Sequence, residues 1–170
     1  MNHEDGRTGV NFRASHYRIA RTAGVCPRCH GNTPMVALML PPGHEALSVD
    51  EGDASPGVDV SSGSAIWESV PRHAFLFYVE SLPDEATRHL QVLAPKYRFA
   101  ASPATGGAYW ANHCVRCDAF QEDQDLFCEP EGAFSPVSSA AASRIELLPV
   151  AEAIEVSAAG YALDPQFVGL

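Results

Sequence analysis

The segment AGVCPRCHGNTP, residues 23–34, contains two cysteines with two residues between them, Cys26 and Cys29. The later segment NHCVRCD repeats this spacing with Cys114 and Cys117. A C-x-x-C turn points two sulfurs the same way, and two such turns complete the tetrahedron of thiolates that structural zinc prefers. The sequence therefore predicts one metal site that joins two distant parts of the chain.

The long separation of the two pairs differs from a typical zinc ribbon, whose pairs lie ~15–20 residues apart. The entropic cost of closing a loop grows only with the logarithm of its length, so a long insertion is tolerated. The alternating segment 15–23 and the apolar run 35–40 predict a hairpin with the first pair at its tip. We expect a single zinc-ribbon-like domain over residues 15–170, with an inserted lobe over about 41–108.

The remaining patterns predict an α+β fold that is mostly antiparallel sheet. Residues 73–80 are aromatic and β-branched, as in a central strand, and residues 81–95 predict one short helix capped by Ser81. Further strands are expected at 96–102, 107–114, 125–134, 142–150 and 153–164. Residues 1–14 are expected to form a flexible arm, and about 48–64 a disordered acidic loop.

Composition places the chain among globular proteins. Its 170 residues are 46% hydrophobic and 19% charged, and no apolar run approaches the ~18 residues that a membrane span needs. The N-terminal segment has no apolar core of the kind a secretory signal requires, so we expect a cytoplasmic location. Paired cysteines in a reducing cytoplasm are typical of metal ligands rather than disulfides.

Charge gives a prediction about partners. The formal net charge of −10 disfavours nucleic acid, whose binders usually present a basic face. Acidic residues are concentrated after the second pair, which favours a protein partner, with a basic protein as the candidate. One feature favours nucleic-acid binding instead: a candidate basic face near the N-terminus, formed by Arg13, Arg18, Arg21 and Arg28.

Three further residues near the pairs are candidates for alternative ligands or for hydrogen-bond donors to the ligands. His30 and His113 each adjoin a ligand cysteine. Cys128 is interpreted as a buried apolar side chain, a spare ligand or a reactive thiol. The metal is expected to be structural zinc, with iron as the alternative because four thiolates also suit a single iron.

Three catalytic patterns are not found in the sequence. A zinc deaminase needs H-x-E with a downstream P-C-x-x-C, which the segments around His44 and Val115 do not supply. A thioredoxin-type pair begins a helix, whereas both pairs here are expected on hairpins. The single lysine, Lys96, does not stand in a glycine-rich phosphate-binding frame.

The chain resembles a group of uncharacterised proteobacterial proteins that carry a split zinc-knuckle arrangement, over most of residues 16–168 outside the acidic loop. Three segments carry the resemblance: YRIARTAGVCPRCHGNTPMVALMLPPGHE, LFYVESLP and TGGAYWANHCVRCDAFQEDQDLFCEPEGAF. In that group Gln-Gly-Asp and an aromatic-Leu-His-x-x-Pro segment follow the second pair. Here Gln121 and Glu122-Asp123 lie near the first pattern, and Cys128 takes the place of the histidine. The resemblance implies the metal site and a compact mixed fold, and it implies no activity.

The sequence leads to three functional hypotheses. The first is a small bacterial metal-stabilised interaction protein, such as an adaptor or an immunity-type partner, rather than an enzyme. The second is a zinc-ribbon nucleic-acid-binding protein that uses the arginine face. The third is a thiol-dependent enzyme or sensor that uses Cys128. A reactive thiol needs an electropositive setting, and the carboxylates around Cys128 supply the opposite.

Overall fold

The protein is described by a computed structural model that covers residues 9–49, 65–165 and 168. Within these residues the strands are β1 (Phe12–Ala14), β2 (Tyr17–Val25), β3 (Asn32–Leu40), β4 (His44–Val49), β5 (Ala65–Val70), β6 (Ala74–Ser81), β7 (Arg98–Ala101), β8 (Ala108–Ala111), β9 (Glu146–Val150) and β10 (Ile154–Leu163). The helices are α1 (Asp84–Leu93), the π-helix η1 (Gln124–Cys128) and α2 (Ser139–Ala142). No helix in this part of the chain is long and apolar enough to cross a membrane.

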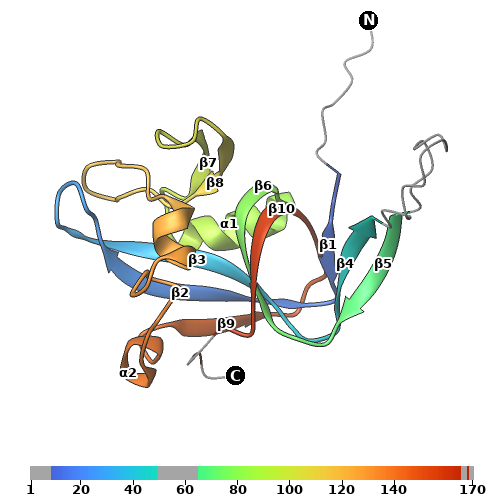
Figure 1. Cartoon of the computed structure of the whole chain (residues 1–170). Coiled ribbons are helices and arrows are strands. Elements are labelled where there is room, and N and C mark those ends of the chain that lie inside the picture. Colours follow the sequence, from blue (N-terminus) through green and yellow to red (C-terminus); the bar gives the residue numbers. More distant parts are fainter. Residues whose placement is uncertain (1–8, 50–64, 166–167, 169–170) are drawn as a thin grey trace, which may run out of the picture.

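The strands form one antiparallel sheet in the order β5-β4-β1-β10-β6-β3-β2-β9 (Figure 1). The β7–β8 hairpin joins the sheet through the pairing of Val79 in β6 with Trp110 in β8. A mostly antiparallel sheet with few helices confirms the predicted α+β class. The strands expected around 15–23, 35–40, 73–80, 142–150 and 153–164 are all present within a few residues of the predicted bounds.

The branch point of the sheet is β6. Its first residues, Ala74 to Leu76, pair with β3, and further along Val79 pairs with β8. The β2–β3 and β7–β8 hairpins therefore diverge from one side of one strand. Residues 41–108, expected as an inserted lobe, supply this central strand and are continuous with the rest of the sheet. Phe75, Leu76 and Val79 of β6 are buried in the core.

Two core clusters fill the two faces of β3. Leu38 packs with Leu76 on one face, which α1 covers with Leu90, whereas Met39 packs with Phe75 on the other face. From Met35 to Leu40 every residue of β3 is buried. This confirms the predicted strand buried on both sides, for which a continuous apolar run is the expected sequence pattern.

Three local predictions need correction, and the first concerns the N-terminal arm. Residues 1–8 lie outside the described residues, but Phe12–Ala14 forms β1 between β10 and β4. Phe12 is 5% exposed and belongs to the main core cluster, so burial of one aromatic side chain holds this segment in the sheet. The acidic loop falls mostly on residues 50–64, which also lie outside the described residues.

The other two corrections concern helices. The helix α1 is present, but Pro83 is its N-cap and no side chain caps it, because Ser81 still belongs to β6 and pairs with Ser157. The segment expected as a strand over 125–134 contains the π-helix η1. Leu126 and Phe127 both pack into the same core cluster, and consecutive residues of a strand would point to opposite faces.

Candidate metal centre

The first cysteine pair lies in a compact turn at the tip of the β2–β3 hairpin. The Cys26 backbone N–H donates to the Gly31 carbonyl at 2.9 Å, and the His30 N–H donates to the Cys26 carbonyl at 2.9 Å. His30 closes the turn in the left-handed region with a φ of 58°. The hairpin prediction is confirmed, and we call this turn the first knuckle, residues 26–31.

The second pair repeats the same backbone in the segment after β8. The Cys114 N–H donates to the Ala119 carbonyl at 2.9 Å, and the Asp118 N–H donates to the Cys114 carbonyl at 2.9 Å. Asp118 has a φ of 63° and stands in the place of His30. We call this turn the second knuckle, residues 114–119. Its sequence lacks a glycine, and aspartate is among the residues that tolerate this conformation best.

Gly31 serves a different purpose from the one its place in the first knuckle suggests. Its own backbone does not need the left-handed region, which His30 occupies. A Cβ atom on Gly31 would instead lie 2.5 Å from Cδ of Arg116 in the second knuckle. Gly31 therefore permits close contact between the two knuckles.

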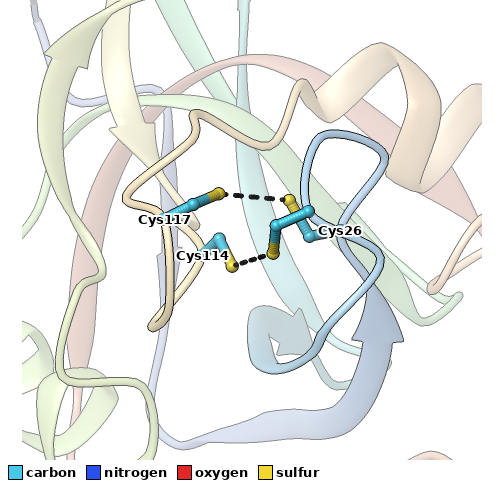
Figure 2. A group of neighbouring side chains, drawn as sticks. Cys26, Cys114 and Cys117 are labelled. Atoms are coloured by element: carbon cyan, nitrogen blue, oxygen red, sulfur yellow. Dashed lines mark hydrogen bonds between the residues drawn. The ribbon is translucent and has the colours of Figure 1, made fainter.

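The four sulfurs converge as the spacing predicted (Figure 2). The sulfurs of Cys26 and Cys117 lie 3.7 Å apart, and those of Cys29 and Cys114 lie 3.6 Å apart. All four lie within 4.8 Å of one another. A tetrahedral zinc with Zn–S bonds of ~2.3 Å requires sulfurs about 3.8 Å apart, whereas a disulfide would bring two of them to about 2.05 Å. The residues present fit a metal ion.

Two of the four thiols ionise more readily than an ordinary cysteine, whereas Cys117 does not. Burial opposes ionisation of Cys26, but N–H groups of Cys29 and Arg28 donate to its sulfur, and the net result lowers its pKa to about 6. The N–H of Cys117 is the largest cause that lowers the pKa of Cys114. The Ala119 N–H lowers the pKa of Cys117, but burial and the sulfurs of Cys26, Cys29 and Cys114 raise it to about 11. Thiolates that are favoured before binding reduce the number of protons that a metal must displace.

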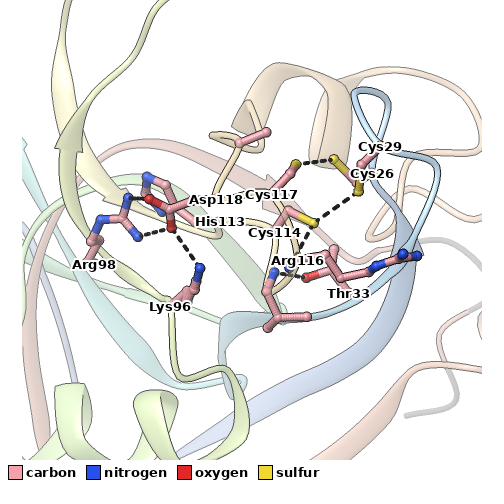
Figure 3. A network of polar contacts seen from close by, with 12 residues as sticks. Cys26, Cys29, Thr33, Lys96, Arg98, His113, Cys114, Arg116, Cys117 and Asp118 are labelled. Atoms are coloured by element: carbon pink, nitrogen blue, oxygen red, sulfur yellow. Dashed lines mark hydrogen bonds and ion pairs between the residues drawn. The ribbon is translucent and has the colours of Figure 1, made fainter.

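Several side chains connect the two knuckles to each other or to neighbouring strands (Figure 3). Thr33 Oγ1 accepts a hydrogen bond from the Val115 N–H at 3.1 Å, and the buried amide of Gln121 donates to the Cys26 sulfur at 3.5 Å. The carboxylate of Asp118 pairs with Arg98 at 3.0 Å and with Lys96 at 3.3 Å. Apart from Gln121, which the resemblance placed near the site, no local pattern predicts these contacts, because their partners are distant along the chain.

The three candidate alternative ligands lie outside the four-sulfur cluster. His30 is exposed. His113 is 4% exposed, donates from Nδ1 to the Ala111 carbonyl at 3.1 Å and packs on Phe120. Cys128 is exposed at the end of η1, so the interpretation as a buried apolar side chain is wrong.

The four arginines of the candidate basic face occupy different environments. Arg13 pairs with Glu45 at 2.6 Å, and Arg21 pairs with Glu146 at 2.7 Å. Arg18 and Arg21 stand an odd number of residues apart in β2, so their side chains leave opposite faces of the strand. Arg28 is exposed in the first knuckle.

Comparison of this chain with models of protein families, with curated proteins and with solved structures finds no match. The resemblance to the proteobacterial group therefore stays a prediction. The geometry alone supports the site: four cysteine sulfurs lie close enough together to hold a metal ion. Four protein ligands would leave no position of a tetrahedral ion open for water or substrate, as in a structural site.

Proposed function

We propose that this chain is a metal-stabilised interaction protein, an adaptor or immunity-type partner that docks onto a basic protein. Structural zinc at Cys26, Cys29, Cys114 and Cys117 would fix the two knuckles in place. The docking surface would be the segment that follows the second knuckle, residues 122–131, which we call the acidic segment. Its free carboxylates are the observation that carries this proposal.

The acidic segment exposes three carboxylates that make no ion pair with any residue the structure describes: Asp125, Glu129 and Glu131. Basic side chains are mostly used internally, as in the pairs of Arg72 with Asp164 and of Arg98 with Asp118. Part of the net charge of −10 thus comes from three exposed carboxylates in one short segment that form no ion pair with described residues. Such a patch speeds encounter with a basic partner.

The acidic segment is also held firmly in place. The Glu122 carboxylate accepts hydrogen bonds from Ser102 Oγ at 2.7 Å and from the Tyr109 hydroxyl at 3.0 Å. The Gln121 N–H donates to the Asn112 carbonyl at 2.9 Å, just before the second knuckle. A docking surface that is ordered before binding loses less conformational entropy on association.

The proposal is tested by affinity capture from a bacterial lysate followed by binding measurements with the purified partner. The metal-loaded chain should capture a basic protein in a salt-sensitive manner. The triple variant Asp125→Asn, Glu129→Gln, Glu131→Gln should lose it. A matched variant that removes three exposed carboxylates elsewhere, Glu68→Gln, Asp84→Asn and Glu155→Gln, should retain it. Equal capture by both variants would exclude the acidic segment as the docking surface.

The two alternative functions have weaker support. Arg13 and Arg21 already neutralise carboxylates, which leaves less free positive charge for phosphate. Retention on heparin that weakens steeply with salt would favour nucleic-acid binding over our proposal. Burial, with the carboxylates of Asp123 and Glu129, raises the pKa of Cys128, which disfavours a reactive thiolate. Rapid alkylation of Cys128 at neutral pH would restore the thiol hypothesis.

A further inference from the structure

A cavity of about 580 Å³ lies between the β1, β4 and β5 strands and the second half of β10. In Figure 1 β1, β4 and β5 stand at the opposite end of the molecule from the tip of the β2–β3 hairpin, which carries the first knuckle. Cavities that bind small molecules typically measure ~300–1,000 Å³. This one is therefore large enough for a ring with a short side chain.

A β-bulge in β10 creates this cavity. The pairing of β10 with β6 shifts register between Ser157 and Ala158, and β10 pairs with β1 only before that point, from Ile154 to Val156. The Asn11 side chain takes over at the bulge: its Nδ2 donates to the Ala158 carbonyl at 2.8 Å and its Oδ1 accepts from the Ala158 N–H at 2.9 Å. Beyond the bulge, β1 and β10 are no longer paired, and the space between them forms the cavity.

The two faces of the β1–β4–β5 ladder have different surroundings. On one face Arg13 pairs with Glu45 and lies over the Trp67 ring, with its guanidinium carbon 4.1 Å from the ring centroid. The other face lines the cavity with apolar side chains, among them Ala46 and Val70. Tyr161 of β10 closes the cavity from the side and is 54% exposed. The charged groups on the first face therefore contact each other, whereas the apolar side chains on the second face border the open cavity.

Two hydrogen-bond acceptors belong to the cavity. His44 is 1% exposed and its Nδ1 lies 2.8 Å from the Pro41 carbonyl. A carbonyl only accepts, so Nδ1 carries the proton of this contact, and in that tautomer Nε2 is the ring atom that can accept. Glu68 makes no ion pair with any described residue, whereas Arg72, the cation of the lining, is already paired with Asp164 at 2.6 Å.

These acceptors stand on the same face of the β4–β5 ladder. His44 is paired with Val70, and Ala46 is paired with Glu68, so His44 and Glu68 are diagonal neighbours. Diagonal neighbours are about 7–8 Å apart at the backbone, and long side chains reach across that distance. One ligand group with several donor hydrogens can therefore contact both.

We propose that this cavity is a binding site for a small ligand that joins an apolar ring to a primary amine. The ring packs over Ala46 and Val70 beside Tyr161, and the ammonium group donates to His44 Nε2 and to the Glu68 carboxylate. The site shares no residue with the metal centre or with the acidic segment. Either proposal can therefore fail without the other.

The test uses the full, metal-loaded chain labelled with ¹⁵N and three probes that share a phenethyl group: phenethylamine, phenethyl alcohol and hydrocinnamate. Phenethylamine should cause saturable shifts of amides in β4, β5 and β10 and of the His44 imidazole nitrogens. The alcohol should bind more weakly, and the carboxylate should not bind. Absence of saturable binding of the amine, or equal binding of the carboxylate, would overturn the proposal.

Two variants localise the binding. Glu68→Gln should lower the affinity for phenethylamine at least about tenfold, because it removes a charge-assisted hydrogen bond, and should leave the affinity for the alcohol unchanged. Glu155→Gln removes the same charge from the face that carries Arg13 and should change neither. Ala46→Leu should fill the cavity and abolish binding of both probes. If that variant does not fold, Tyr161→Ala, at the exposed residue that closes the cavity from the side, should weaken binding of both probes. Unchanged amine binding in Glu68→Gln would contradict the proposal.

Discussion

At the scale of single residues, two asparagine side chains make the hydrogen bonds that the backbone of a neighbouring strand would otherwise make. Asn112 is 2% exposed, and its side-chain amide accepts from the Val36 N–H at 2.9 Å and donates to the Val36 carbonyl at 3.0 Å. Asn11 pairs in the same way with Ala158. In each case the amide reproduces the donor and acceptor of a neighbouring backbone where the sheet opens. The first of these contacts lies directly before the second knuckle and ties it to β3.

The Asn112 contact can be tested with a variant of almost the same shape. Asn112→Asp keeps an acceptor for the Val36 N–H but removes the donor for the buried Val36 carbonyl. The free energy of unfolding of the metal-loaded protein should fall by about 1–3 kcal/mol, the usual cost of an unsatisfied buried group. Urea unfolding measures it. The same change at the half-buried Asn11 should cost less, and an equal cost at both positions would contradict the role of burial.

Asp123 supports a prediction about pH. Its carboxylate is 3% exposed and accepts from the Tyr78 N–H at 2.8 Å, where Tyr78 has a φ of 50° within β6. Burial is the largest cause that raises the pKa of Asp123, and the Tyr78 N–H opposes it. The Glu122 carboxylate raises the pKa further, and the net effect is a change from 3.8 to about 7. The folded state thus holds this proton more tightly than the unfolded chain does.

A group with a raised folded pKa stabilises fully below its unfolded pKa, and this contribution is lost as pH rises through its folded pKa. Asp123 should therefore make the protein less stable, by a few kcal/mol at most, as pH rises from about 4 to about 7. Asp123→Asn removes the titration and keeps an acceptor for Tyr78. As pH rises through this range, the free energy of unfolding of the wild-type protein should fall relative to that of the variant. A difference that is constant with pH would contradict the prediction.

At the scale of elements, the π-helix η1 explains a glycine that the sequence left unexplained. Gly132 follows η1, and the Phe134 N–H donates to the Leu126 carbonyl at 2.9 Å to close the turn. A Cβ atom at Gly132 would collide with the carbonyl groups of Asp125 and Leu126, the latter oxygen at only 2.6 Å. Backbone atoms cannot rotate away as a side chain can, so this site requires glycine.

Two glycine substitutions compare these elements. Gly132→Ala should destabilise the protein by about 1–3 kcal/mol, as overpacking against a backbone does. Gly31→Ala should cost less, because it meets the flexible end of the exposed Arg116 side chain. Thermal or urea unfolding of both variants measures the costs. A larger loss for Gly31→Ala would show that Arg116 cannot move and that the two knuckles are more rigidly packed than we infer.

At the scale of the whole molecule, the metal centre joins two hairpins that leave the same side of β6. The metal is expected to contribute roughly 10 kcal/mol, comparable with the entire stability of a small domain. Without it, the knuckles retain their own turns and the contacts of Asn112, Thr33 and Gln121, and the second knuckle also keeps the ion pairs of Asp118. The position of the first knuckle relative to the second would then depend on these weaker contacts.

Metal removal tests this arrangement directly. The purified protein should contain about one zinc per chain by elemental analysis. A strong chelator should greatly accelerate hydrogen exchange at the N–H groups of Cys26, His30, Cys114 and Asp118, which form the two knuckles. Cys26→Ser should lose the metal, whereas Cys128→Ser, at the exposed cysteine outside the cluster, should keep it. Retention of full metal content by Cys26→Ser would refute the four-cysteine site.

The sequence by itself determined the ligand set and most of the strands. Cysteine spacing and alternating or continuous apolar runs are local patterns, and the physics behind them acts over a few residues. The glycine-free second knuckle could be placed from its cysteines alone, although its closing residue, Asp118, could not.

Only the tertiary structure decided how these parts meet. The β10 bulge, the π-helix after Asp123 and the asparagine contacts to Val36 and Ala158 depend on partners distant along the chain, whose free backbone groups no local pattern reveals. The cavity beside His44 has the same origin, since it exists only because β1 and β10 separate at that bulge. Burial of unpaired polar groups is costly, and the fold must satisfy them wherever the sheet opens.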